Sequence, residues 1–156
     1  MAWIFSLWIE AEKSSEKKAI KEYFDERKIF VNDKEYTISA YESGMITVDG
    51  ISRIGITSKS DVDEMTSIGN RLYELLRNAP KFRYAMTGTE VDGFADIDEL
   101  TDDPEFYLRF KGIVIDENLY KAIKGRRKMK TFSEGYLWTP YEGETWNELI
   151  EATNKT

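Results

Sequence analysis

Residues 2–10 are largely apolar at both sets of alternating positions, and this constrains the fold more than any other feature of the sequence. A period of two with apolar residues in both sets predicts a β-strand that is covered on both faces. We therefore expect a strand in the interior of a sheet, with Trp3 and Trp8 in the core.

Two residue types are missing, because the chain of 156 residues contains no cysteine and no histidine. The first absence excludes disulfides, thiolate zinc sites and cysteine nucleophiles. The second removes the commonest general acid and base and the commonest transition-metal ligand. We expect no metal and no cofactor, and surface recognition is favoured over an enzymatic function.

Length and composition predict one globular domain over residues 1–156. Hydrophobic residues make up 41% of the chain and charged residues 33%, which is the mixture of a folded protein. No apolar run reaches the roughly 18 residues that span a bilayer, and residues 2–9 lack the flanking features of a secretory signal. We expect a cytoplasmic protein.

Local patterns predict the helices and strands. One helix is expected at 15–28 with Ser14 or Ser15 as its N-cap, and another from Ser60 or Asp61 to Asn78. Strands are expected at 36–41, 45–48, 51–56 and 82–86, with a type I′ turn at Asp49-Gly50. The last third predicts strands at 110–115 and 131–138, a short helix from Asp116 to Ile123, and a C-terminal helix from Thr145.

This order of elements predicts an α+β fold, with an antiparallel or mixed β-sheet and helices packed mainly on one face. A ferredoxin-like core with additions is one arrangement that the order allows.

The clearest anomaly is the stretch from Glu90 to Glu105, which holds eight carboxylates and no lysine or arginine. Apolar residues recur every three positions within it, so they can hold the segment to the body while the carboxylates face solvent. A solvated acidic segment is the simplest interpretation, and a docking surface for a basic protein is the functional one. The residues expected at such a surface are Glu90, Asp92, Phe94, Asp96, Asp98, Glu99, Asp102 and Asp103, with Trp138 and Tyr141 as further aromatic anchors.

A calcium or magnesium site is the third interpretation, since these ions take carboxylate ligands. Residues 92–98 lack the oxygen ligands before the glycine and the distal glutamate of an EF-hand loop. This interpretation is therefore the least favoured.

A basic cluster follows the acidic stretch. Nucleic acid is not expected as its partner, because the cluster has no adjacent aromatic platform and the chain carries a formal net charge of −7. A solvated helix end is the better interpretation, and pairing with the acidic stretch inside the fold is another. The cluster consists of Lys121, Lys124, Arg126, Arg127, Lys128 and Lys130.

Aromatic residues gather near the C-terminal end of the chain. Core packing is the first interpretation of this group, and an interface or sugar-stacking role is the second. The group consists of Phe132, Tyr136, Trp138, Tyr141 and Trp146.

The sequence contains no Walker, Rossmann or G-x-S-x-G motif. The favoured hypothesis is a non-catalytic acidic protein-binding module, an inhibitor or immunity-type protein that docks on a basic, nucleic-acid-processing partner. The alternative is a small carboxylate-based enzyme or a ligand-binding protein for a sugar or nucleotide. The oligomeric state and the strand order do not follow from the sequence.

Overall fold

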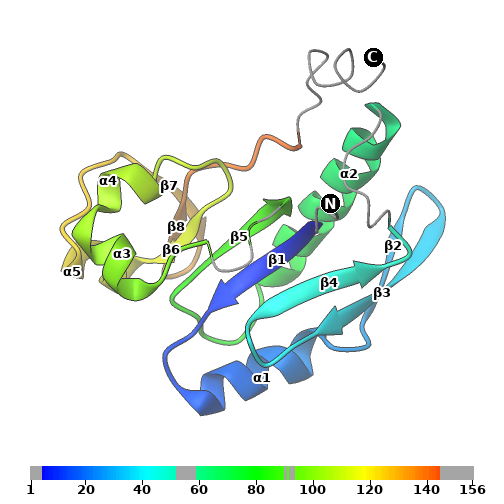
Figure 1. The fold of residues 1–156 in the computed structure, drawn as a ribbon, viewed down its shortest axis with the longest axis horizontal. Helices are drawn as coiled ribbons and strands as arrows, with labels where there is room; N and C mark the ends of the chain where they lie inside the picture. The colour runs from blue at the N-terminus through cyan, green and yellow to red at the C-terminus, as the bar shows by residue number, and fades with distance from the viewer. Residues whose placement is uncertain (1–4, 52–58, 90, 92–93, 145–156) are drawn as a thin grey trace, which may run out of the picture.

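One eight-stranded antiparallel sheet forms the centre of the protein in a computed structural model of the chain (Figure 1). The structure describes residues 5–51, 59–89, 91 and 94–144. The strands are β1 (Phe5–Glu10), β2 (Lys28–Val31), β3 (Lys34–Ala40), β4 (Met45–Asp49), β5 (Tyr84–Thr89), β6 (Val114–Asp116), β7 (Lys130–Ser133) and β8 (Tyr136–Trp138). The helices are α1 (Ser14–Phe24), α2 (Lys59–Leu76), α3 (Ile97–Asp102), α4 (Pro104–Tyr107) and α5 (Glu117–Ala122).

The strand order is β2-β3-β4-β1-β5-β6-β8-β7, which confirms the expected interior position of the first strand. β1 pairs with β4 along one edge and with β5 along the other. Leu7 is fully buried on the face that carries α1 and α2, while Trp8 packs into a second core on the opposite face. Trp3 lies outside the described residues.

A ferredoxin-like core is present, as the sequence allowed. Elements β1-α1-β3-β4-α2-β5 follow the order β-α-β-β-α-β, and their strands lie in the order β3-β4-β1-β5 with every neighbouring pair antiparallel. The additions are β2 at one edge and the group β6-β8-β7 at the other.

The helices divide between the two faces. α1 and α2, the two long helices, pack on one face through side chains such as Phe24 and Leu72. The three short helices gather beyond β5 (Figure 1), and the second core joins Leu100 and Leu108 of this part to Tyr84 and Ile115 of the sheet. Of the described helices, none is both long and apolar enough to cross a membrane.

The type I′ turn lies at a different place from the one predicted. Asn32 and Asp33 join β2 to β3 and have φ values of 52° and 64°, and two successive positive φ values are the signature of this turn. At the predicted site, only Gly50 has a positive φ, and Asp49 is still part of β4. Both edges of β4 are occupied, one by β3 and the other by β1. Of the partner strand expected at 51–56, the structure describes Ile51 alone.

Other boundaries also differ from the prediction. Residues 131–138 form the hairpin β7–β8 instead of one strand, because Gly135 takes a positive φ of 83° at the turn. The N-cap of α1 is Lys13, whose backbone N–H donates to the Glu16 carboxylate at 3.0 Å. Asp116 caps α5 as predicted, with its carboxylate accepting from Leu119 N at 2.9 Å. The expected C-terminal helix lies outside the described residues.

A buried tyrosine joins α2 to β5 and to the segment directly before β6. The Tyr73 hydroxyl donates to Gly112 O at 2.7 Å and accepts from Thr87 N at 3.0 Å. Burial raises the pKa of Tyr73, so its hydroxyl stays protonated and able to donate.

Replacing Tyr73 with Phe tests this bridge. The variant leaves a buried carbonyl and a buried N–H without their partner, so we expect a loss of about 1–3 kcal/mol in the free energy of unfolding by urea denaturation. Tyr41→Phe is the matched control, since Tyr41 is 49% exposed. Equal effects of the two variants would contradict the role given to Tyr73.

Tyrosine burial also predicts weakening of the fold at alkaline pH. Burial, aided by a hydrogen bond to Glu64, raises the pKa of Tyr36 from 10.0 to about 12. Above pH 10 the unfolded chain loses this proton while the folded chain retains it, so the free energy of unfolding falls as the pH rises towards 12. In a Tyr36→Phe variant, the free energy of unfolding measured by urea denaturation should fall less steeply with pH over this range. The same dependence on pH in the variant and the wild type would contradict the role given to Tyr36.

Candidate functional site

The acidic stretch folds into α3 and α4, two short helices in direct succession. Asp96 caps α3 by accepting from Glu99 N at 2.8 Å, and the Glu99 carboxylate accepts from Asp96 N at 3.2 Å. This reciprocal pair is a capping box. Asp103 caps α4 in turn, and Pro104 takes the first helical position.

These bonds divide the carboxylates into two groups. Asp96, Glu99 and Asp103 hold helix ends together. Asp98 and Asp102 are exposed, and no hydrogen bond or ion pair from the described residues reaches either carboxylate. Because no described residue binds these two, they are the carboxylates of the described stretch that are most available to a partner. Glu90 and Asp92 lie outside the described residues.

Four aromatic rings cluster on the same segment, and one of them, Tyr107, donates to Glu99 at 3.2 Å. Phe94 makes edge contacts with Tyr107 and Phe110, with ring centroids 5.5 and 5.2 Å apart. Phe106 contacts the same two rings at 5.0 and 5.5 Å, and 42% of Phe106 is exposed. The Arg109 guanidinium lies 4.5 Å from the centroid of the Phe106 ring. We call the four rings with Asp98 and Asp102 the α3–α4 surface.

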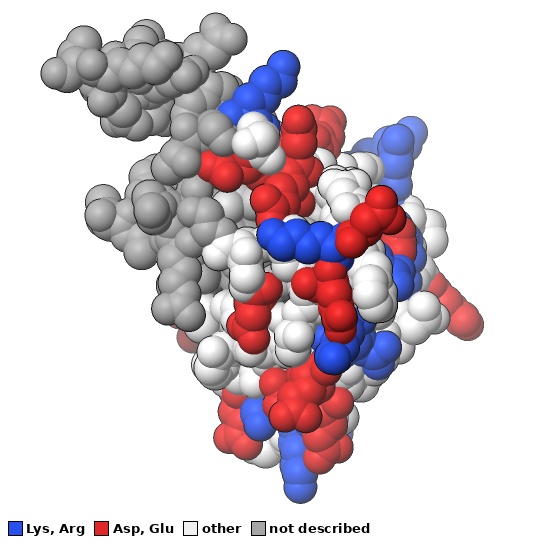
Figure 2. Space-filling view, turned by 90° about the vertical axis from the view of Figure 1, so that its right-hand side faces the viewer, with Lys and Arg blue, Asp and Glu red and all other residues white. Residues whose placement is uncertain are grey.

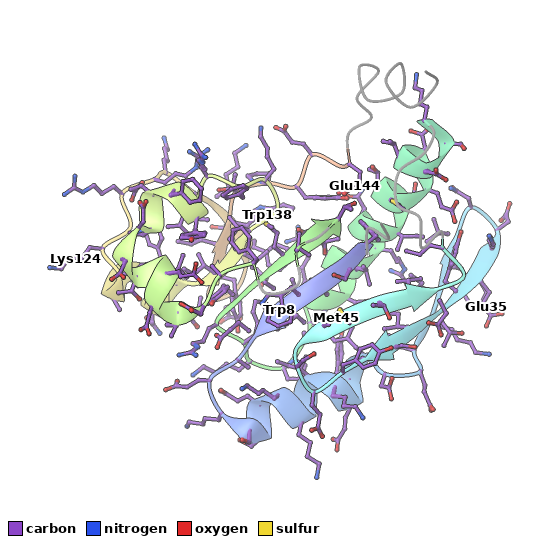
Figure 3. All side chains as sticks on the ribbon, in the orientation of Figure 1. Trp8, Glu35, Met45, Lys124, Trp138 and Glu144 are labelled. Atoms are coloured by element: carbon purple, nitrogen blue, oxygen red, sulfur yellow. The ribbon has the colours of Figure 1, made fainter. Side chains whose placement is uncertain are left out.

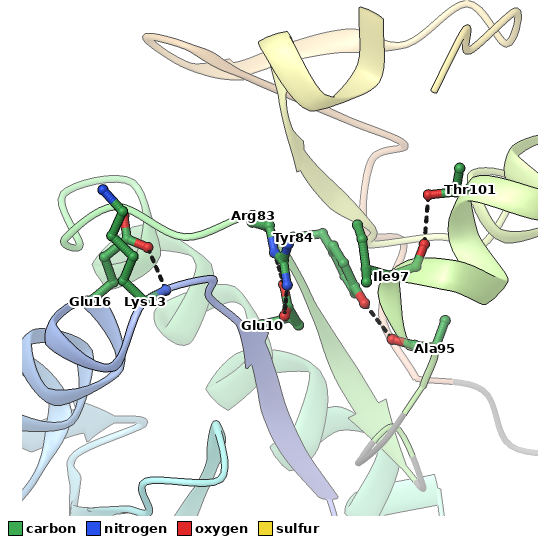
Figure 4. Close-up of polar contacts among 8 residues, drawn as sticks. All are labelled: Glu10, Lys13, Glu16, Arg83, Tyr84, Ala95, Ile97 and Thr101. Carbon is green, nitrogen blue, oxygen red and sulfur yellow. Dashed lines mark hydrogen bonds and ion pairs between the residues drawn. The ribbon is translucent and has the colours of Figure 1, made fainter. Parts of the chain in front are cut away.

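The sheet holds this surface in place. The Tyr84 hydroxyl of β5 donates to Ala95 O at 2.5 Å, directly before α3 (Figure 4). Beside it, Arg83 donates to both Glu10 oxygens at 2.6 and 2.5 Å, and these bonds raise the pKa of the Arg83 guanidinium. Within α3 the Thr101 hydroxyl donates to Ile97 O at 2.6 Å.

The basic cluster touches the acidic stretch through a backbone bond, and among the described residues none of its side chains forms the ion pair with the stretch that one interpretation of the sequence expected. Arg126 N donates to the Glu105 carboxylate at 2.6 Å, and the Tyr120 hydroxyl donates to Arg127 O at 2.5 Å. All six lysine and arginine side chains of the cluster are exposed, and Lys124 lies at the outer end of this part of the molecule (Figure 3).

The structure does not bring Trp138 and Tyr141 to the α3–α4 surface. Alternation along β8 directs Trp138 to the sheet face that carries α2. There the centroids of the Trp138 and Tyr73 rings lie 5.4 Å apart. The Tyr141 ring packs on Tyr73 with the two ring centroids 4.9 Å apart, and the Tyr141 hydroxyl donates to the Glu144 carboxylate at 2.8 Å. The second Glu144 oxygen accepts from the Thr89 hydroxyl at 3.2 Å, so this carboxylate ties the chain after β8 to β5.

The sequence interpretation missed Phe106, Tyr107 and Phe110 as members of the surface. Their signal was present, since Phe106 and Phe110 stand four residues apart directly after the last carboxylates. The described part of the chain holds no group of three or more aspartate and glutamate side chains arranged to bind a metal ion.

Comparison with known proteins assigns no family, because no family model, no curated protein and no solved structure matches the chain.

Two aspartates of the same stretch provide a test of the division between capping and available carboxylates. Asp96→Ala removes the cap of α3 and should lower the free energy of unfolding by about 1 kcal/mol in urea denaturation. Asp98→Ala makes the same change of charge without loss of a cap, so we expect a change of no more than about 0.5 kcal/mol. The division fails if Asp98→Ala is the more destabilising variant.

Proposed function

We propose that the chain is a non-catalytic protein-binding module that docks through the α3–α4 surface on a basic partner. The observation that carries the proposal is the exposed Phe106 ring, which lies within an aromatic cluster on the same segment as Asp98 and Asp102, two exposed carboxylates that no described residue binds. Protein interfaces commonly combine a desolvated aromatic anchor with a charged rim.

Charge supports a basic partner. The formal net charge is −7, and Asp98 and Asp102 are exposed on the same segment as the aromatic rings, while the Arg109 guanidinium at the Phe106 ring carries the opposite sign. Complementary charge raises the rate of association and disfavours partners of the same sign. A nuclease or another nucleic-acid-processing protein presents such a basic surface at its phosphate-binding site, and docking there would inhibit it.

Rigidity supports the proposal as well. The cap at Asp96, the bond from Tyr84 to Ala95 O and the bond from Arg126 N to Glu105 fix the backbone around the surface before any partner arrives. A surface that is ordered in advance loses less conformational entropy on binding.

Comparative affinity capture tests the proposal. The immobilised chain, a Phe106→Ala variant and an Asp98→Asn/Asp102→Asn variant are exposed to the same native lysate, and retained proteins are quantified by mass spectrometry. We expect a basic protein that the wild type retains and both variants lose. With the purified partner, each variant should weaken binding roughly tenfold, and the wild-type affinity should fall with added salt.

Glu12→Gln/Glu22→Gln is the matched control, because it removes two exposed carboxylates elsewhere in the chain. The same loss of the partner in this control would attribute the effect to net charge alone. A partner that both α3–α4 variants bind as well as the wild type does would refute the proposed surface.

A further inference from the structure

Five of the six cations in the basic cluster have no ionic partner among the described residues. Lys121 forms an ion pair with Glu117 at 3.4 Å. The other five side chains are exposed, and none of them forms an ion pair with a described carboxylate. Residues 118–133 contain no aspartate or glutamate, so like charges stand close together along this segment and repel one another.

Neither structural explanation of the basic cluster accounts for these five cations. The helix macrodipole favours cations only within the last turn of a helix, and α5 ends at Ala122, so the run from Arg126 to Lys130 lies beyond it. Pairing with the acidic stretch is the other explanation, but the bond between the two segments comes from the backbone N–H of Arg126 to the Glu105 carboxylate. The five charged groups are therefore available to an anionic partner.

The backbone that carries the basic cluster is held by hydrogen bonds to α5. Gly125 N donates to Tyr120 O at 3.0 Å, and the Tyr120 hydroxyl donates to Arg127 O at 2.5 Å. A Cβ atom at Gly125 would lie 2.3 Å from the Tyr120 ring, so this close approach requires glycine. Cations on a backbone that is ordered in advance lose less conformational entropy on binding.

The basic cluster is a local feature of an acidic chain. Lys124 and Glu35 lie at opposite ends of the molecule in Figure 3, and Figure 2 shows the end of Glu35, where lysine and arginine are interspersed with aspartate and glutamate. At about 0.1 M salt, charges more than about 10 Å apart are largely screened. The cations of the cluster, rather than the net charge of −7, therefore determine which ions are attracted to this end.

We propose that the basic cluster binds the phosphate backbone of a nucleic acid, independently of the partner that docks on the α3–α4 surface. Its two arginines can each bind a phosphate through two parallel N–H bonds, and the three unpaired lysines add point charges. Contacts to the backbone need no aromatic platform, because stacking serves the bases. A membrane surface fits less well, since Met129, the one apolar side chain of residues 124–130, is partly buried and offers no anchor.

Fluorescence anisotropy at low salt tests the proposal, with a labelled single-stranded DNA, a single-stranded RNA and a duplex DNA of equal length. We expect the wild type to bind at least one of them, and Arg127→Gln/Lys128→Gln to bind it roughly tenfold more weakly. The slope of the logarithm of the binding constant against the logarithm of the salt concentration should also be smaller in the variant, by about two, since each phosphate contact contributes about one.

Lys17→Gln/Lys18→Gln is the matched control, because it removes two successive exposed cations of α1 and changes the net charge equally. With both variants folded by circular dichroism, the control should bind as the wild type does. Equal weakening in the control, or a wild type that binds none of the three nucleic acids, would overturn the proposal. Unlabelled poly-glutamate tests the choice of phosphate, and displacement of the labelled strand by it as readily as by unlabelled nucleic acid would overturn that choice in favour of an acidic protein.

Discussion

The pairing of β1 with both β4 and β5 is the constraint on which the rest of the structure depends. Alternation along β1 sends Leu7 to the core under α1 and α2 and Trp8 to the second core, so one strand belongs to both. β5 continues this division, because Tyr84 faces the second core and holds the segment before α3 through Ala95 O. The position of the α3–α4 surface therefore follows from the central strands.

The carboxylates of the acidic stretch have different physical roles, although the sequence presents them as one run. Asp96 and Asp103 satisfy N–H groups at helix starts, and Glu105 accepts from the neighbouring basic cluster. Asp98 and Asp102 remain for solvent or a partner. The proposed docking surface thus depends on fewer charges than the run contains, and on an aromatic anchor that composition alone did not single out.

Long elements with a strong period were predictable from the sequence. β1 and α2 each contain many apolar positions at regular spacing, so the central strand and the long helix followed from them, whereas the order of elements allowed a ferredoxin-like core without deciding it. β2 was missed because it has only four residues. Ile29 and Val31 are buried, but the alternate positions hold Lys28 and the apolar Phe30, so the sequence shows no clear alternation of polar and apolar residues. The type I′ turn was misplaced because Asp-Gly favours positive φ more strongly than Asn-Asp, while strand pairing on both sides of β4 decided the outcome. Trp138 was expected at the acidic surface because sequence does not show which face of a short strand a residue occupies.

Photo-cross-linking from position 106 tests the central claim most directly. A photoreactive phenylalanine analogue at position 106, with the same analogue at Tyr41 as the comparison, samples two exposed aromatic positions of the same chain. The account predicts a cross-link from position 106 to a basic protein, lost at high salt, and no such product from position 41. Cross-links to the same protein from position 41 and none from position 106 would contradict it.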